Sequence, residues 1–268
     1  MAIPLTNVFP LFPLLRERPF GLITDLDGTI SPTAETPAAA VVSPACRCYL
    51  EAIAARAALV AVVSGRTVEE ARQMVGLKSL VYVGLHGFSL AMPPVWTEAS
   101  AAAYTVLARS VLDELRRVIA LPGVVFEDKG PLIAVHYRQA ADPLAARQAI
   151  LDAIAGAPTA RRFARHEGKM VVELRPPAPQ VHKGTVVRHL AAQQALRSVL
   201  YLGDDATDID AFRAVREATA FRGASVVVTG EETPPEVLAA ADYRVEGVAG
   251  VEWLLGEVAR AVAGERAS

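Results

Sequence analysis

The stretch Gly21-Leu22-Ile23-Thr24-Asp25-Leu26-Asp27-Gly28-Thr29 holds a short apolar run that ends in two carboxylates. The apolar run is typical of a buried strand. Because side chains alternate along an extended chain, Asp25 and Asp27 would leave the sheet on the same side, and Gly28 would let the backbone turn away. Paired carboxylates repel unless a cation neutralises them, and oxygen ligands suit Mg²⁺. One carboxylate can then attack a phosphoryl group while the other protonates the leaving oxygen.

Three further polar groups follow apolar runs, and ligands of open parallel sheets bind at the carboxyl ends of strands. Ser64-Gly65-Arg66 precedes a helix start, where a hydroxyl and a backbone amide suit phosphate. Lys183 begins a predicted helix, and Asp204-Asp205-Ala206-Thr207-Asp208-Ile209-Asp210 follows a predicted strand. A turn, a solvated lysine or a helix cap would explain each group alone, and Asp-x-Asp-Gly also occurs in calcium loops. Together the four groups supply a nucleophile, an acid, phosphate donors, a cation and metal carboxylates.

Short β-rich runs alternate with helical stretches on both sides of the middle of the chain. Ser43-Pro44 begins one predicted helix, and the capping-box stretch Thr67-Val68-Glu69-Glu70 begins another that ends near Gly76. A third predicted helix covers 183–193. The predicted strands cover 21–24, 59–63, 80–83, 198–202 and 224–228. This alternation predicts a doubly wound parallel sheet with helices on both faces, the α/β class.

The middle of the chain has a different rhythm. Apolar residues at helical spacing run from Tyr104 to Ile119, and a second predicted helix covers 143–154. Each helix is followed by two predicted strands, at 124–127 and 132–138, then at 161–166 and 170–175. We therefore expect an inserted α+β domain over 100–179 with an antiparallel sheet, and a core domain formed by 1–99 and 180–268. Pro176-Pro177-Ala178-Pro179 would link the two.

The composition excludes several classes of protein. Of the 268 residues, 52% are hydrophobic and 21% charged, so the chain can bury a core and is not a disordered protein. The net charge of −2 gives no field of one sign for nucleic acid or an anionic membrane. Cys46 and Cys48 are too close for an ordinary disulfide and too few for a zinc site, and are expected to pack as thiols. Without a signal peptide or an apolar span, a soluble cytoplasmic protein is expected.

The order of the four groups resembles the four motifs of the haloacid dehalogenase superfamily of phosphohydrolases, and the insert resembles the large cap of its sugar phosphatase branch. Over nearly its whole length the chain is most similar to the trehalose-6-phosphate phosphatase family. That similarity rests on the stretches Val63-Ser64-Gly65-Arg66, Gly84-Leu85-His86-Gly87, Glu127-Asp128-Lys129-Gly130, His136-Tyr137-Arg138, Glu173-Leu174-Arg175-Pro176, Lys183-Gly184 and Gly203-Asp204-Asp205-Ala206-Thr207-Asp208.

The resemblance and the residues together imply a two-step, Mg²⁺-dependent phosphatase. Asp25 would form an aspartyl-phosphate, while Asp27 protonates the sugar oxygen and later deprotonates water. Ser64 and Lys183 would neutralise the phosphoryl oxygens. Mg²⁺ would be held by Asp25, Asp204 and the backbone carbonyl of Asp27, with Asp208 as a ligand or as a neighbour of the ligands.

The same resemblance implies that polar residues of the core loops and of the cap bind the substrate. Sugar hydroxyls need paired donors and acceptors, and specificity comes from leaving such groups unpaired with the wrong ligand. The alternative is that polar residues on an antiparallel sheet merely face solvent. The predicted substrate-binding residues are Gly65, Arg66, His86, Gly87, Glu127, Lys129, His136, Arg138, Glu167, Lys169 and Glu173.

One residue departs from the family pattern. Ile209 stands where the family commonly has glutamate after Thr-Asp, which leaves the hydrolase chemistry intact but weakens the claim to the exact sugar. Two alternatives therefore stay open: a phosphatase for another sugar or polyol phosphate, and a non-catalytic sugar-phosphate-binding regulatory module. The expected partner is a small-molecule sugar phosphate, with no nucleic acid or membrane, and the chain is expected to be a monomer.

Overall fold

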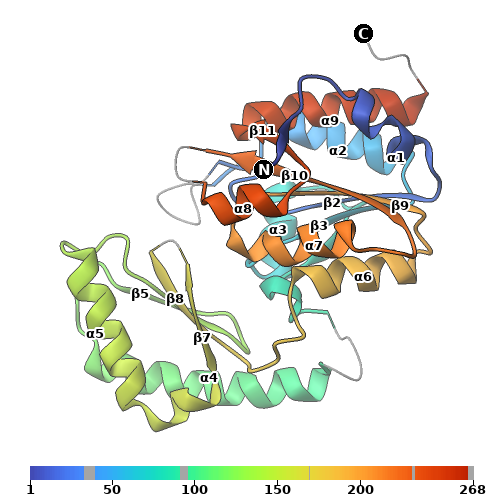
Figure 1. Cartoon of the computed structure of the whole chain (residues 1–268). Helices are drawn as coiled ribbons and strands as arrows, with labels where there is room; N and C mark the ends of the chain where they lie inside the picture. The colour runs from blue at the N-terminus through green and yellow to red at the C-terminus, as the bar shows by residue number, and fades with distance from the viewer. Residues whose placement is uncertain (33–39, 91–95, 169, 231–232, 265–268) are drawn as a thin grey trace. The chain divides into compact units, whose positions relative to one another are not determined.

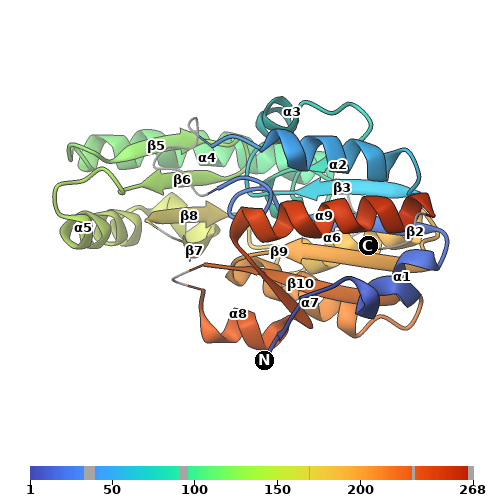
Figure 2. The same ribbon diagram turned by 90° about the horizontal axis from the view of Figure 1, so that it is seen from above.

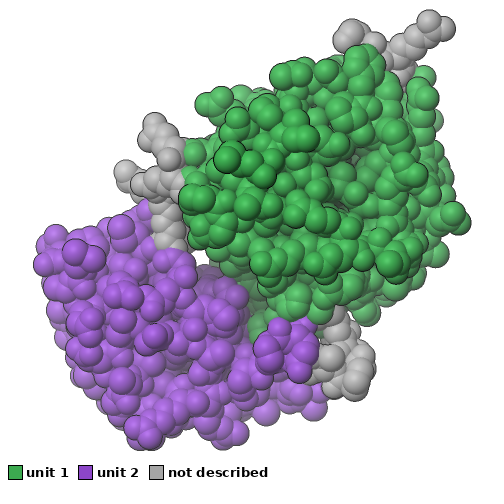
Figure 3. Space-filling model, viewed as in Figure 1, with its two compact units in different colours: residues 1–90, 181–268 green, residues 91–180 purple. Residues whose placement is uncertain are grey.

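The computed structural model describes residues 1–32, 40–90, 96–168, 170–230 and 233–264. The chain forms two compact units, which are coloured separately in Figure 3. Unit 1 comprises residues 1–90 and 181–268, and unit 2 comprises residues 91–180. Unit 1 is therefore discontinuous in sequence, whereas unit 2 is one continuous segment.

Unit 1 is built on a parallel sheet. Within the described residues the sheet has seven strands in the order β1-β11-β10-β9-β2-β3-β4, and all neighbours are parallel. Strand β2 lies inside the sheet, where Phe20 pairs with Ser198 of β9 and Gly21 with Leu59 of β3. The strands are β1 (Ile3–Pro4), β2 (Phe20–Thr24), β3 (Leu59–Val63), β4 (Val81–Val83), β9 (Ser198–Gly203), β10 (Arg222–Thr229) and β11 (Tyr243–Glu246).

Helices cover both faces of this sheet, with α2 and α9 on one face and α6 and α7 on the other (Figure 1). The central strands β2 and β3 are buried along their whole length, as a strand between two helical layers must be. This arrangement confirms the predicted doubly wound α/β class. The helices are α1 (Phe12–Arg16), α2 (Pro44–Ala54), α3 (Val68–Val75), α6 (Lys183–Gln193), α7 (Ile209–Arg216), α8 (Pro235–Ala240) and α9 (Gly247–Ala263), with 3-10 turns η1 (Phe9–Leu11), η3 (Leu85–Gly87) and η5 (Ala206–Asp208).

The helix starts expected from the sequence are present. The Ser43 side chain accepts a hydrogen bond from the backbone N–H of Cys46 and caps α2. Thr67 and Glu70 form a reciprocal capping box at the start of α3, and Gly76 ends that helix in the left-handed conformation, at φ 73°. Local capping chemistry therefore sets where both helices begin.

The order of the strands creates a point where the chain diverges. From β2 the chain moves to β3 and β4 at one edge of the sheet, whereas from β9 it moves to β10 and β11 on the other side. The loops after β2 and β9 therefore separate at the carboxyl ends of neighbouring strands. Such a switch point is the usual ligand position in open α/β sheets.

Unit 2 is an antiparallel sheet in the order β5-β6-β8-β7, with its elements seen from above in Figure 2. Val111 and Leu115 from one helix and Ile150 from the other share a buried cluster with Val135 and Val172 of the sheet. Its elements are α4 (Glu98–Val118), β5 (Val125–Asp128), β6 (Ile133–His136), α5 (Pro143–Gly156), η4 (Pro158–Arg162), β7 (Ala164–Gly168) and β8 (Val171–Arg175).

One predicted boundary in unit 2 is wrong. The sequence predicts a strand from Arg161, but Arg161 and Arg162 lie in the 3-10 turn η4 and β7 begins at Ala164. Pro158 stands at the first position of that turn, where its fixed φ favours a helical start. The strand therefore begins three residues later than predicted.

Among the described helices, none is long and apolar enough to cross a membrane. Cys46 is buried and Cys48 is exposed, and both are free thiols.

Helix α5 offers a matched test of the unit 2 core. Ile150 is fully buried, whereas Leu144 on the same helix is 79% exposed. Replacing Ile150 by Ala leaves a cavity and should lower the free energy of unfolding of unit 2 by about 2–5 kcal/mol. Leu144→Ala should change it by less than about 0.5 kcal/mol. Urea unfolding with hydrogen exchange of unit 2 amides measures both, and equal losses would contradict the packing described.

Candidate active site

Asp25 stands directly after β2, at the switch point of the unit 1 sheet. Its backbone N–H donates to the Leu202 carbonyl of β9 at 2.8 Å, which fixes the residue at the end of the strand pair. Lys183, the first residue of α6, is buried, and its Nζ donates to Asp25 Oδ1 at 2.8 Å. The same Nζ donates to Asp208 Oδ1 at 2.7 Å. The Lys183 ammonium group thus contacts two of the other three groups predicted from the sequence.

Asp208 is held by four hydrogen bonds from the protein. Oδ1 accepts from Lys183 and, at 2.6 Å, from the hydroxyl of Tyr201 on β9. Oδ2 accepts from the backbone N–H groups of Asp204 and Asp205 at 3.0 and 3.1 Å. A carboxylate offers about four lone-pair positions, so protein donors use all of those of Asp208. Tyr201 was not predicted from the sequence, although a polar-tipped residue within the otherwise apolar strand β9 was a visible signal.

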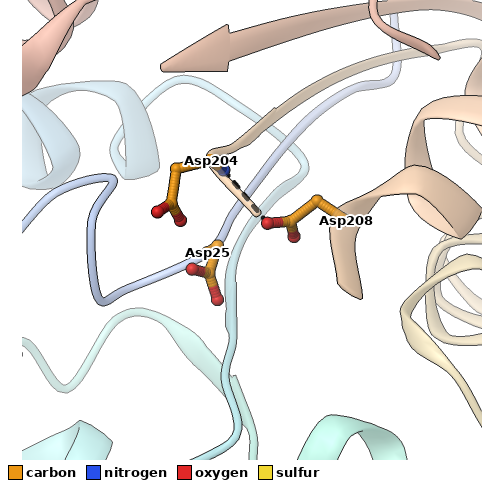
Figure 4. A group of neighbouring side chains, drawn as sticks. All are labelled: Asp25, Asp204 and Asp208. Atoms are coloured by element: carbon orange, nitrogen blue, oxygen red, sulfur yellow. Dashed lines mark hydrogen bonds between the residues drawn. The ribbon is translucent and has the colours of Figure 1, made fainter. Parts of the chain in front are cut away.

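Three carboxylates form a cluster that can hold a metal ion (Figure 4). One oxygen each of Asp25, Asp204 and Asp208 lies within 4.8 Å of the others. Thr29 Oγ1 donates to Asp204 Oδ1 at 3.3 Å. A Cβ on Gly28, which has φ +82°, would lie 2.0 Å from Asp204 Oδ2, so only glycine permits this close approach. The all-oxygen donor set fits a hard divalent cation such as Mg²⁺.

The carboxylates of the cluster carry more negative charge than Lys183 neutralises. Burial raises the pKa of Asp25 well above its ordinary value, and burial also raises that of Asp208. Burial and the neighbouring charges of Asp208 and Asp205 raise the pKa of Asp204 to about 8. Burial alone would lower the pKa of Lys183, but the Asp208 and Asp25 carboxylates outweigh it and raise that pKa. A bound cation would oppose these shifts in the carboxylates.

Asp27 lies beside Arg66, which follows β3. Arg66 Nε donates to Asp27 Oδ2 and Arg66 Nη2 to Asp27 Oδ1, both at 2.7 Å. The backbone N–H of Arg66 donates to Oγ of the buried Ser64 at 3.1 Å. From the sequence, Asp27 was predicted to be catalytic and Arg66 to bind substrate, and the pairing of the two was not predicted.

The turn after β4 packs against the Ser64 turn. The backbone N–H of His86 donates to the Ser64 carbonyl at 2.9 Å, and the N–H of Leu85 donates to the Arg66 carbonyl at 2.8 Å. A Cβ on Gly65 would lie 2.6 Å from His86 Nε2, so the imidazole packs directly over that glycine. Gly87 has φ 111°, a conformation that favours glycine. His86 and Gly87 therefore support the backbone that carries Ser64.

Unit 2 carries a chain of paired charges across one face of its sheet. His136 Nε2 lies 2.8 Å from Glu127 Oε2, and Lys129 Nζ lies 3.4 Å from the same oxygen. Lys129 Nζ also lies 3.5 Å from Glu173 Oε1, and Arg175 Nε donates to Glu173 Oε2 at 2.8 Å. Burial tends to raise the pKa of Glu127, but the His136 hydrogen bond and the Lys129 charge lower it overall. Arg175 was not among the predicted site residues, although it stands two positions after Glu173 on the same face of β8.

Another predicted residue of unit 2, Glu167, lies on the other face of the sheet. Glu167 pairs across β7 and β8 with Val172, a core residue, so it lies on the helix-covered face. There it accepts a hydrogen bond from Nε of Arg147 on α5 at 2.8 Å. Arg138 follows β6 by two residues, and Lys169 lies outside the described residues.

Comparison with known proteins identifies related sequences. The family model described as trehalose-phosphatase matches residues 23–248. A trehalose-phosphate phosphatase of Mycobacterium marinum is 35% identical over 243 residues, which cover 88% of this chain and 60% of that protein. One from Mycobacterium tuberculosis is 38% identical over 203 residues, which cover 71% and 50%. The chain thus spans about half to 60% of the length of these relatives.

Solved structures share the fold at lower identity. The C-terminal domain of Candida albicans trehalose-6-phosphate phosphatase has a TM-score of 0.75 and 21% identity, covering 96% of this chain and 98% of that one. A sucrose-phosphatase from Synechocystis, solved with sucrose and phosphate, has a TM-score of 0.53 and 20% identity, covering 90% and 98%.

The raised pKa of Asp204 predicts how stability depends on pH. Between about pH 4 and pH 8 the folded chain without metal keeps a proton on Asp204 that the unfolded chain has lost, so this contribution to stability falls as pH rises. Mg²⁺ binds the ionised form, and its stabilising effect should grow over the same interval.

Thermal unfolding at pH 6 and pH 8, with chelator and with Mg²⁺, tests this dependence. Asp204→Asn is the matched control: its unfolding temperature in chelator should fall less than that of the wild type between the two pH values. Identical pH dependence in the wild type and the variant would show that Asp204 does not titrate as described.

Proposed function

We propose that this chain, which belongs to the trehalose-phosphatase family, hydrolyses trehalose 6-phosphate to trehalose and inorganic phosphate. The observation that carries the proposal is the buried Asp25, held by Lys183 at the switch point of the sheet and next to two further carboxylates. Relatives that are 35–38% identical bear the name trehalose-phosphate phosphatase, which supports the choice of substrate.

Asp25 is the proposed nucleophile. A carboxylate oxygen attacks phosphorus, the bond from phosphorus to the sugar oxygen breaks, and an aspartyl-phosphate forms. Asp27 gives its proton to the departing sugar oxygen. In the second step Asp27 takes a proton from water as the water attacks phosphorus, and the bond to Asp25 breaks to release phosphate.

Lys183 and Ser64 are the proposed ligands of the phosphoryl oxygens. Lys183 is fixed by two carboxylates, so its ammonium group meets a developing charge with little reorganisation. The Ser64 hydroxyl lies in the turn after β3, at the same carboxyl edge as Asp25. Asp208 orients Lys183 and is itself anchored by Tyr201.

Mg²⁺ is the proposed cofactor, held by Asp25, Asp204 and the backbone carbonyl of Asp27. Asp208 lies within the same cluster, but its oxygens are engaged by protein donors, so we assign it to orienting Lys183. When bound, the cation supplies charge neutralisation at the phosphoryl oxygens. Gly28 leaves the space that the Asp204 carboxylate needs.

The paired charges of unit 2 are proposed to bind the sugar hydroxyls. Glu127, Lys129 and Glu173 hold one another in place, so their remaining donors and acceptors point in defined directions. Such preorganised groups reject a sugar that leaves them unpaired. His136 and Arg138 are proposed to extend this set, whereas the pairing of Glu167 with Arg147 favours a structural role for that residue.

Hydrolysis of another sugar or polyol phosphate is the second candidate. Ile209 is the residue that favours it, because it begins α7 directly after Asp208 where the resembled family commonly has glutamate. A hydrocarbon side chain cannot make the hydrogen bonds of a carboxylate.

Phosphate release from trehalose 6-phosphate and glucose 6-phosphate, with Mg²⁺ and with chelator, tests the function. Asp25→Asn should lower turnover by more than about a thousandfold because the nucleophile is lost. The exposed Asp113→Asn is the matched control and should keep wild-type turnover. Full activity of Asp25→Asn would contradict the nucleophile, and equal turnover of glucose 6-phosphate would contradict the disaccharide substrate. A wild type without turnover would favour the regulatory module.

A further inference from the structure

Arg66 and Asp27 form a two-point ion pair within unit 1. Each Asp27 oxygen accepts one guanidinium N–H at 2.7 Å, so the planes of the two groups are aligned. Paired N–H to oxygen bonds of this kind are the most directional contacts between an arginine and a carboxylate. The Arg66 side chain is 14% exposed and the Asp27 side chain 39%. The less exposed partner is therefore the arginine.

Arg66 is itself fixed through its backbone. Its N–H donates to Ser64 Oγ, and its carbonyl accepts from the N–H of Leu85 in the neighbouring turn. Gly65, directly before it, is covered by the His86 imidazole. The guanidinium thus extends from a turn that is anchored on two sides, which makes it a rigid point of attachment for the more exposed Asp27.

An acid at Asp27 must present one oxygen to the leaving oxygen, within roughly 2.6–3.2 Å of it. In the two-point pair both Asp27 oxygens are engaged by Arg66. Each oxygen keeps a second lone-pair position, so either one can carry the proton while its contact with Arg66 stays in place. The two contacts fix the plane of the carboxyl group, because the Arg66 backbone is held by Ser64 and Leu85 independently of Asp27.

We infer that Arg66 is a positioning residue for the acid–base group: it fixes the plane of the Asp27 carboxyl group and so directs a free lone-pair position of that group to the leaving oxygen. This inference rests on the proposed function, because it takes Asp27 as the acid and base of the reaction. It assigns no binding of substrate to Arg66. It replaces the expectation from sequence that Arg66 binds the substrate. The effect on the reaction passes entirely through Asp27.

The leaving group separates this role from phosphate binding. When a sugar leaves, the electron pair of the broken bond and the Asp27 proton both go to the sugar oxygen. When p-nitrophenolate leaves, the released electron pair is stable on its oxygen without a proton. The first step with p-nitrophenyl phosphate therefore needs Asp25 but not a positioned acid, whereas the second step needs Asp27 as base for both esters.

The test compares Arg66→Gln with the wild type on trehalose 6-phosphate and p-nitrophenyl phosphate, in steady state and in a rapid-mixing experiment. For trehalose 6-phosphate we expect kcat to fall about a hundredfold or more while KM changes less than about threefold. For p-nitrophenyl phosphate we expect a burst of about one p-nitrophenolate per chain at a rate close to that of the wild type. The exposed Arg197→Gln is the matched control and should change neither reaction.

Two further variants link the effect to Asp27. Asp27→Asn should show the same pattern, and adding Arg66→Gln to it should cost little more, because the two residues act as one unit. Arg66→Lys keeps the charge but makes a single contact, and should recover part of kcat for trehalose 6-phosphate. Circular dichroism and thermal unfolding establish that each variant folds. If Arg66→Gln does not fold, Arg66→Lys is compared with the wild type instead.

Several results would overturn the role. A similar rise in KM for both esters and in the inhibition constant of inorganic phosphate, with kcat unchanged, would make Arg66 a phosphate ligand. Fully additive effects of the Arg66 and Asp27 variants would show that they act independently. A wild type that hydrolyses neither ester would overturn the proposed function, and this role with it, whereas the other two results leave the proposed function standing.

Discussion

The contact of the Lys183 ammonium group with Asp25 and Asp208 is the interaction on which the site depends. Two carboxylates buried side by side would repel each other, and burial of each charge costs on the order of several kcal/mol without a partner. Lys183 offsets this cost at both carboxylates, at 2.8 and 2.7 Å. Because it is the first residue of α6, the placement of that helix against the sheet decides whether the site exists.

The parallel sheet supplies the second constraint. Strands β2 and β9 are neighbours with parallel pairing, so the residues that follow them emerge at the same edge. Asp25 and Asp204 meet there without any local sequence relationship. Two glycines leave the space that the neighbouring carboxylates need, since a side chain at Gly28 would collide with Asp204 and one at Gly203 would collide with Asp208. A few residues therefore provide both the space for the carboxylates and the positive charge that neutralises them.

Much of the fold and the central site could be predicted because their signals are local. Capping residues such as Ser43 and Thr67 mark helix starts, and the acids of the cluster directly follow apolar runs. The partners of these groups could not be predicted, because Arg66 meets Asp27, and Tyr201 meets Asp208, through tertiary packing that no local pattern encodes. Glu167 could not be assigned to a face of the sheet either, because that depends on register, and a shift of one residue exchanges the faces.

The division of unit 1 into two segments sets an order of assembly. Asp25 and Lys183 are 158 residues apart, and the segment between them includes all of unit 2. During synthesis on the ribosome β2 emerges early but cannot pair with β9 until Ser198 and the residues after it have followed. Unit 2 is continuous and has its own buried core, so it can fold in the interval and shorten the effective loop that must close. Asp25 is therefore among the first parts of the site to be made, and Lys183, which neutralises it, among the last.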